Sequence, residues 1–179
     1  TTLNGEGLQH QDGHSHILAS TVPSMLSFDP AFGFELAMIV RDGMYRMYQA
    51  QEDIFYYLTL YNENYRMPSL IDVVESSGLS EEEVTQGVLA GGYCFDKANN
   101  VADVHLLASG SIMQQAIEAK TRLEASGFGV SLWSITSFVE LQRDALATAA
   151  HNRQDPTGQP RTSTLQAMFA DASGAIIAV

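Results

Sequence analysis

The sequence has 179 residues, 45% of them apolar, which is enough to bury a hydrophobic core and places the chain among globular rather than disordered proteins. The formal net charge is −12, and the 9 Lys plus Arg residues form no basic stripe, so nucleic acid is not expected as a partner. No apolar run approaches the roughly 20 residues of a membrane-spanning helix, and the N-terminus lacks a basic start and an apolar signal core, so we expect a cytoplasmic chain without a membrane partner.

The single cysteine, Cys94, lies in the apolar context GGYCF. The sequence holds no second cysteine with which it could form an intramolecular disulfide, so a reducing compartment is favoured. Its apolar neighbours predict a buried structural thiol rather than a reactive one.

Both ends of the sequence predict a piece of a longer protein. The sequence opens at Thr1 without an initiating Met, inside a Gly-rich polar stretch, and it closes on the apolar run 174–179. A run of this kind normally forms a strand that is buried between neighbouring strands. We therefore expect the sheet to continue beyond Val179.

The first part of the chain predicts one long helix and one strand. Residues 1–30 are rich in Gly, His, Ser and Asp without a sustained period, so we expect a long irregular segment, and such loops often carry function. Apolar residues recur at helical spacing over 31–48, after the start signal Asp29-Pro30. The run IFYYLTL at 54–60 is typical of a buried strand.

Acidic and Gly-rich stretches between residues 69 and 100 predict a boundary between two domains. Within this segment, Ser80 is followed by three glutamates, a pattern that predicts a capped helix start. We expect a first domain at 1–78, a linker at 79–102 and a second domain at 103–179.

The second half alternates strands and helices, which predicts right-handed βαβ units, a parallel sheet and hence an α/β fold. The predicted strands are 104–108, 130–135 and 175–179. The predicted helices are one that starts near Ile112 and is closed by Gly127, and two more at 138–149 and 165–170.

Three of the five histidines lie close together, at His10, His14 and His16, among glycines that let the backbone approach a ligand closely. One interpretation is a metal site to which Glu6 or Asp12 adds an oxygen ligand, although the Gly-rich composition disfavours the helix that would bring His10 and His14 onto one face. A second is catalytic, because imidazoles on such a loop can orient a carboxylate and donate protons to an oxyanion near neutral pH. A third is structural, with the histidines bonding the loop to itself.

Two further segments of the sequence could bind a ligand or take part in catalysis. The run Ser109-Gly110-Ser111 follows a predicted strand and opens a helix, but it lacks a full nucleotide-binding pattern and predicts a tight turn with an N-cap serine. Glu63 follows a predicted strand end, and ligand sites in α/β proteins lie beyond the carboxyl ends of strands. Glu63 is therefore either a functional residue or a solvated loop carboxylate.

Five runs of the sequence carry more information than spacing alone. In chain order they are LNGEGLQHQDGHSHILAST, DPAFGFELAMIVRDGMYRMY, FYYLTLYNENYRMP, LLASGSIM and SITSFVELQRD. Together they closely resemble the corresponding stretches of the homodimeric-type pyruvate dehydrogenase decarboxylating component, a thiamine-diphosphate enzyme. The resemblance runs over nearly the whole chain, although 69–100 matches that family poorly.

The resemblance implies two partial parallel-sheet domains of the transketolase type. The first half would be the end of the domain that binds the aminopyrimidine ring of thiamine diphosphate, and the second half would be the start of the transketolase-like C-terminal domain. It also implies that His14, in DGHS, faces the cofactor and helps to bind and protonate the pyruvate-derived adduct. His16 aligns with the active-site histidine of the related transketolase motif and is the second candidate. Glu63, in YNENY, would lie at the mouth of the active site.

The implied reaction is oxidative decarboxylation of pyruvate with acetyl transfer to lipoamide on the dihydrolipoyl acetyltransferase, carried out by a homodimer. The residues that bind thiamine diphosphate and Mg²⁺ would lie mainly outside this chain, so an isolated piece is expected to be inactive. Two alternatives stay open. One is a thiamine enzyme that acts on another 2-oxo acid, and the other is a noncatalytic α/β domain for binding or assembly.

Overall fold

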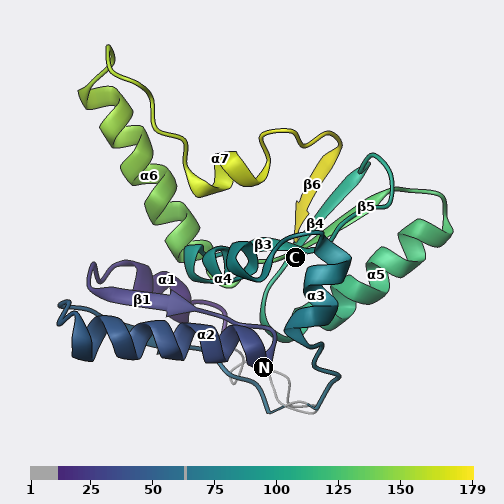
Figure 1. Ribbon diagram of the computed structural model, residues 1–179, viewed down its shortest axis with the longest axis horizontal. Helices are drawn as coiled ribbons and strands as arrows, with labels where there is room; N and C mark the ends of the chain where they lie inside the picture. Colours follow the sequence, from purple (N-terminus) through teal and green to yellow (C-terminus); the bar gives the residue numbers. More distant parts are fainter. Residues whose placement is uncertain (1–11, 63) are drawn as a thin grey trace.

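The computed structural model describes residues 12–62 and 64–179. Figure 1 shows two groups of strands with helices packed around them. The strands form a two-stranded sheet, β1-β2, and a four-stranded sheet with the order β3-β5-β4-β6. Within the described ranges, no helix combines the length and the apolar character needed to cross a lipid bilayer.

The first sheet pairs β1 (Met25–Phe28) with β2 (Phe55–Leu58) in parallel. Between the two strands runs α2 (Gly33–Met44), which continues as a π-helix at Tyr45–Gln49. The helix predicted over 31–48 is thereby confirmed. β2 is less buried than expected, since Phe55 is 45% exposed and its other three residues are only partly buried.

The prediction of an irregular segment over 1–30 is wrong for its later part, which contains α1 (Ser15–Ser20) as well as β1. These elements have 6 and 4 residues. They are too short for a helical or strand period to be recognised within a polar, Gly-rich sequence.

The expected linker 79–102 contains regular structure. α3 (Leu70–Ser77) and α4 (Glu81–Ala90) both begin with a capping box, and the helix start predicted at Ser80 is confirmed. β3 (Tyr93–Asp96) follows α4 and pairs with β5 in an antiparallel register. The second sheet therefore begins inside the segment that we expected to connect two domains.

The second sheet has the parallel centre that the strand and helix alternation predicted. β4 pairs in parallel with both β5 and β6, and the antiparallel edge strand β3 was not predicted. β6 lies at the opposite edge with Ile176 53% exposed, so within the described residues this apolar run has a neighbouring strand on one side only. The bounds are β4 (Val104–Ala108), a 3₁₀ turn (Gly110–Ile112), α5 (Met113–Ala125), β5 (Val130–Ser134), α6 (Phe138–Gln154), α7 (Thr164–Met168) and β6 (Ala175–Ala178).

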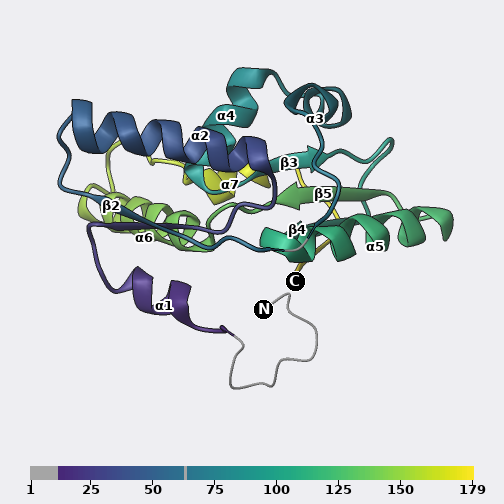
Figure 2. The same cartoon turned by 90° about the horizontal axis from the view of Figure 1, so that it is seen from below.

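One hydrophobic core joins the two sheets. Phe32, just before α2, stacks on Phe95 of β3 with ring centroids 5.0 Å apart. Ile39 of α2 and Val88 of α4 belong to the same core and have no exposed surface. Figure 2 shows α2 lying along the first sheet and reaching the helices and strands of the second half. The two halves are therefore packed against each other through α2 and α4.

Cys94 lies in β3, where Trp133 of β5 is its register partner. Burial raises the pKa of its thiol to about 11. The thiol therefore stays protonated near neutral pH, as expected of a structural cysteine.

Candidate functional site

The carboxyl ends of four strands meet in one place. Asp29 directly follows β1 and Thr59 directly follows β2, while Gly110 and Thr136 come shortly after β4 and β5. The backbone joins them, because the Asp29 amide donates to the Thr136 carbonyl over 2.7 Å and the Gly110 amide donates to the Asp29 carbonyl over 3.1 Å. Ligand sites in α/β proteins lie beyond the carboxyl ends of strands, so this junction is the candidate site.

The Asp29 carboxylate organises the junction. Its Oδ1 accepts hydrogen bonds from the Thr59 hydroxyl at 2.5 Å and from the Tyr61 hydroxyl at 2.9 Å. Burial and the charge of Asp29 both raise the pKa of Tyr61. The Tyr61 hydroxyl therefore stays protonated and remains a hydrogen-bond donor.

The tight turn predicted at Ser109-Gly110-Ser111 closes the junction from the side of β4. Gly110 has φ 50°, and a Cβ atom there would lie 2.7 Å from the Tyr61 ring and 2.8 Å from Oδ2 of Asp29. The turn therefore requires glycine. Ser109 occupies the N-cap position, as predicted for a serine of this turn, although its side chain makes no capping hydrogen bond.

His16 lies in the first turn of α1 and is tied to both strands of the first sheet. Its Nδ1 is hydrogen-bonded to the Ser27 hydroxyl, and its Nε2 lies 2.9 Å from the Thr59 hydroxyl oxygen. The Tyr57 ring packs edge-on against the imidazole, with centroids 5.4 Å apart. Both ring nitrogens of His16 are therefore engaged by the protein itself.

His14 is the N-cap residue of α1, and its side chain is exposed. Its backbone N–H and that of Ser15 donate to Oδ1 of Asp12 over 3.1 and 3.0 Å. Hydrogen bonds from Ser15 and His14 hold the pKa of Asp12 below its usual range, so Asp12 caps the helix as a carboxylate. The structure thus presents the His14 imidazole at a helix start whose backbone is fixed.

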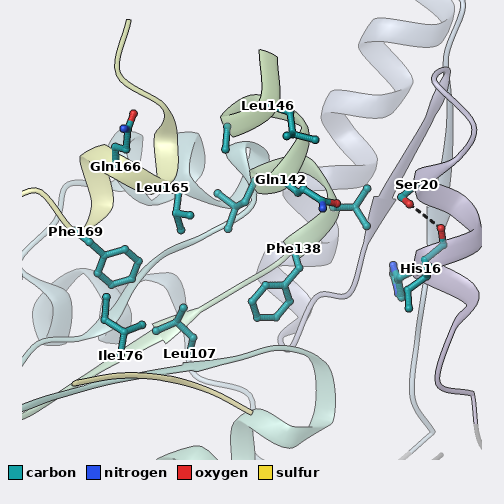
Figure 3. A pocket seen from close by; sticks show the side chains of 14 residues that line it. His16, Ser20, Leu107, Phe138, Gln142, Leu146, Leu165, Gln166, Phe169 and Ile176 are labelled. Atoms are coloured by element: carbon teal, nitrogen blue, oxygen red, sulfur yellow. Dashed lines mark hydrogen bonds between the residues drawn. The ribbon is translucent and has the colours of Figure 1, made fainter. Parts of the chain in front are cut away.

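A largely apolar cleft of about 970 Å³ opens beside α1. Figure 3 shows His16 and Ser20 on one side of it, facing side chains of α6, α7 and β6 on the other. Few polar side chains reach the cleft, so it is suited to an apolar or partly apolar occupant. The lining residues that Figure 3 labels are His16, Ser20, Leu107, Phe138, Gln142, Leu146, Leu165, Gln166, Phe169 and Ile176.

Arg143 of α6 fixes the connection between α1 and β1. Its Nη1 donates to the Met25 carbonyl over 2.6 Å and to the Glu140 carboxylate over 2.9 Å. Its Nη2 donates to the carbonyls of Val22 and Ser20 over 2.8 and 3.2 Å. One planar guanidinium therefore holds the segment that carries His14 and His16 against the second half of the chain.

The interpretation of the histidine cluster as a metal site gains no support from the described residues, which contain no group of three or more His, Cys, Asp or Glu side chains placed to hold a metal ion. Asp12 caps α1, and the nitrogens of His16 are engaged by Ser27 and Thr59. His10, Glu6 and Glu63 lie outside the described residues. The structure brings His14 and His16 onto the same helix start but gives them different surroundings.

Sequence reasoning missed Ser27, Asp29 and Thr59, which position His16, and Arg143, which holds the segment between α1 and β1. Thr59 lies inside the strand predicted at 54–60, and only the observed end of β2 at Leu58 places it beyond a strand end. Asp29 also lies beyond a strand end, but β1 was not predicted, and Asp29 was interpreted only as part of a helix start. The sequence around Arg143 carries no signal that could have revealed its contacts with a segment more than 100 positions earlier in the chain.

Two family models match the chain. Residues 1–68 match the pyruvate dehydrogenase E1 component middle domain, and residues 91–179 match the transketolase-like TK C-terminal domain. The chain is 42% identical over 181 residues to the pyruvate dehydrogenase E1 component of Pseudomonas aeruginosa and 41% identical over 175 residues to that of Escherichia coli, which covers 99% and 96% of the chain. It spans 19% of the length of each of these relatives.

Among solved structures, transketolases have the same fold. A transketolase variant from Pichia stipitis matches with a TM-score of 0.61 over 96% of this chain and 20% of that one. Transketolase from Leishmania mexicana matches with a TM-score of 0.60 over 95% of this chain and 20% of that one, and both are 20% identical in sequence. The predicted α/β fold of the transketolase type is confirmed.

Proposed function

Because the chain belongs to the pyruvate dehydrogenase E1 component family, we propose that it forms part of the active site of an enzyme that decarboxylates pyruvate oxidatively and passes the acetyl group to a lipoyl group. The carboxylate of pyruvate leaves as carbon dioxide. The lipoyl disulfide is reduced, and one of its sulfurs takes up the acetyl group as a thioester. The sequence similarity over nearly the whole chain supports this proposal.

Thiamine diphosphate and Mg²⁺ are the proposed cofactors, bound mainly by residues outside this chain. Thiamine diphosphate supplies the electron sink that decarboxylation of a 2-oxo acid requires. The described residues do not fit a metal site, and the cleft beside α1 is largely apolar. This chain would therefore contribute one wall of the active site and the groups that orient the substrate, whereas the residues that bind the diphosphate would lie elsewhere in the enzyme.

The observation that carries the proposal is the placement of His14. Its exposed imidazole stands at the start of α1, the helix that is anchored to the carboxyl ends of β1 and β2. Near neutral pH an imidazole can bind a carboxylate by a hydrogen bond and can donate a proton to a developing oxyanion. We assign both of these roles toward pyruvate to His14, and we assign Glu63 to the mouth of the same site.

The partners follow from the same proposal. The complete enzyme would be a cytoplasmic homodimer that delivers acetyl groups to a lipoyl-bearing dihydrolipoyl acetyltransferase. The net charge of −12 on this chain is suited to contact with a basic partner module. The isolated chain would be inactive.

The test is substitution of His14 in the complete parent enzyme. We expect His14→Ala to leave thiamine diphosphate binding largely intact and to slow pyruvate turnover by roughly a hundredfold, the scale usual for one acid or base group. His151→Ala, in the last turn of α6, is the matched control and should leave turnover unchanged. Unchanged turnover in His14→Ala would refute the assigned role.

Substrate choice is tested with the same wild-type enzyme. Pyruvate should be turned over faster than longer or acidic 2-oxo acids when each is supplied with lipoamide. Preference for another 2-oxo acid would instead assign the chain to a related thiamine enzyme that acts on that acid. Turnover of none of them by the cofactor-loaded parent would favour the noncatalytic binding domain.

A further inference from the structure

Two histidines lie at the start of α1, and their hydrogen bonds separate them. His14 is exposed, whereas His16 has a protein hydroxyl at each ring nitrogen. A neutral imidazole has one N–H donor and one bare nitrogen, so the partners of His16 determine which nitrogen carries the proton.

The direction of these hydrogen bonds follows from Asp29. Its carboxylate has only acceptors, and the Thr59 hydroxyl donates its single proton along the 2.5 Å contact to Oδ1 in preference to the Phe28 carbonyl, which lies 3.4 Å away. The Thr59 oxygen then offers only lone pairs to Nε2 of His16, which lies 2.9 Å away. Nε2 must therefore carry a proton and donate it.

The other nitrogen completes the pattern. With the proton on Nε2, the bare Nδ1 accepts the hydroxyl proton of Ser27, whose side chain has no exposed surface. Within the described residues, the Ser27 hydroxyl makes no second hydrogen bond that could take its proton if Nδ1 were also a donor. The neutral ring with its proton on Nε2 therefore satisfies every group in this chain of contacts.

We propose that Asp29 is a positioning residue, which acts through the hydroxyl of Thr59 to commit the proton of His16 to Nε2 and so makes His16 the anchor of α1. His16 then has no nitrogen left for a ligand. The exposed imidazole at this helix start belongs to His14, two positions earlier. The assignment of His14 as the group that meets substrate rests on the proposed function, but the protonation pattern of His16 does not.

The first measurement is the ¹⁵N spectrum of the imidazole rings in the full 179-residue chain labelled at histidine. We expect His16 to show a single neutral tautomer with a protonated Nε2 and a bare Nδ1. His14 should show the averaged pattern of a solvated ring. A His16 ring with its proton mainly on Nδ1, or an even mixture of the two tautomers, would overturn the proposal.

Four substitutions distinguish the effect of Asp29 on the His16 tautomer from a general loss of structure. Thr59→Val and Asp29→Ala should each abolish the single tautomer of His16. Thr59→Ser keeps the hydroxyl, and Tyr61→Phe removes the second hydrogen bond to Asp29 while leaving the Thr59 hydroxyl in place, so both should keep the tautomer. If Asp29→Ala leaves the His16 pattern unchanged while its backbone amide spectrum shows a folded chain, Asp29 does not act in this way.

Acylation of the wild-type chain gives a second test that needs no variant. Diethyl pyrocarbonate attacks unprotonated imidazole nitrogens, and peptide mapping by mass spectrometry resolves His14 from His16. His16 should react slower than His14 by roughly tenfold, the factor for breaking about one hydrogen bond. Equal rates for the two rings would count against the proposal. Neither measurement uses turnover, so a failed His14→Ala experiment and a failed anchor experiment are distinguishable.

Discussion

The hydroxyl of Tyr93 donates a 2.7 Å hydrogen bond to Oε1 of Glu35, a carboxylate without exposed surface that lies 58 positions earlier in the chain. The Ser134 hydroxyl donates to the same oxygen over 2.6 Å. The backbone amides of Ala31 and Phe32 donate to Oε2 over 2.7 and 3.1 Å. One carboxylate thus joins the start of α2 to strands β3 and β5 of the other sheet.

Replacing Glu35 by Gln should destabilise the protein strongly. The amide NH₂ group of Gln would face either the two backbone N–H groups, which can only donate, or the two hydroxyls, which would have to accept from it and lose the acceptor for their own protons. In both orientations buried hydrogen-bond donors are left without acceptors. We expect the free energy of unfolding to fall by about 3 kcal/mol, measured by urea denaturation. Tyr93→Phe keeps the packing and removes one donor, so it should cost about 1 kcal/mol. Equal stability of Glu35→Gln and wild type would contradict this account.

Glu35 should also shape the dependence of stability on pH. Burial raises the pKa of its carboxyl above the usual 4.5 in the folded state, although hydrogen bonds from Ser134, Tyr93 and the backbone oppose this shift. The stability due to its protonation is therefore present below pH 4.5 and is lost as the pH rises through the raised folded pKa. The difference in unfolding free energy between wild type and Glu35→Gln should narrow over that range. If the difference in unfolding free energy widened as the pH rose, the pKa of Glu35 would be lowered in the folded state and not raised.

Arg143→Lys should loosen α1 while leaving the second sheet intact. A lysine ammonium cannot reproduce the fork that reaches Met25, Val22 and Ser20 together. We expect faster hydrogen exchange over 15–22, by roughly tenfold, and unchanged exchange in β4 and β5. Arg122→Lys is the control, because that side chain is 78% exposed and pairs with Glu118 on the surface of α5. Unaltered exchange at 15–22 in Arg143→Lys would show that other contacts hold this segment.

Gly110→Ala should disturb the candidate site more than a comparable substitution elsewhere. The new Cβ atom would lie 2.7 Å from the Tyr61 ring and 2.8 Å from Asp29, in addition to the strain of φ 50°. We expect a loss of about 2 to 3 kcal/mol in the free energy of unfolding. Gly78→Ala has a similar φ of 74° with no atom within 4 Å of the new Cβ, so it should cost only about 1 kcal/mol. Equal losses would mean that the close approach at Gly110 is relieved without cost.

Periodic elements could be predicted from the sequence because they are long. α2 and α5 bury one face each, and their apolar spacing extends over several turns. β1 and β3 have four residues each, which is too few for alternation to be recognised. The pairing of β3 against β5 also depends on contacts across the sheet, which no local pattern encodes.

The candidate site was only partly visible for a similar reason. His14 and His16 stood out because histidines cluster in a short run. Asp29 and Thr59 are single polar residues, and they become neighbours only when β1 and β2 pair in parallel. Their roles depend on register and on the direction of individual hydrogen bonds, which follow from the folded structure rather than from spacing.

The wide sequence separation of the contacts at the strand ends has a kinetic consequence. Thr59 and Tyr61 reach Asp29 across 30 and 32 positions, and the Ser137 hydroxyl reaches the Ser27 carbonyl across 110. Closing such long loops costs chain entropy before any contact is gained, whereas a helix such as α5 forms from its own sequence. A newly made chain should therefore acquire most of its helical structure early and the geometry around His16 late. Any condition that slows the pairing of β1 with β2 would delay the appearance of that geometry without delaying the helices.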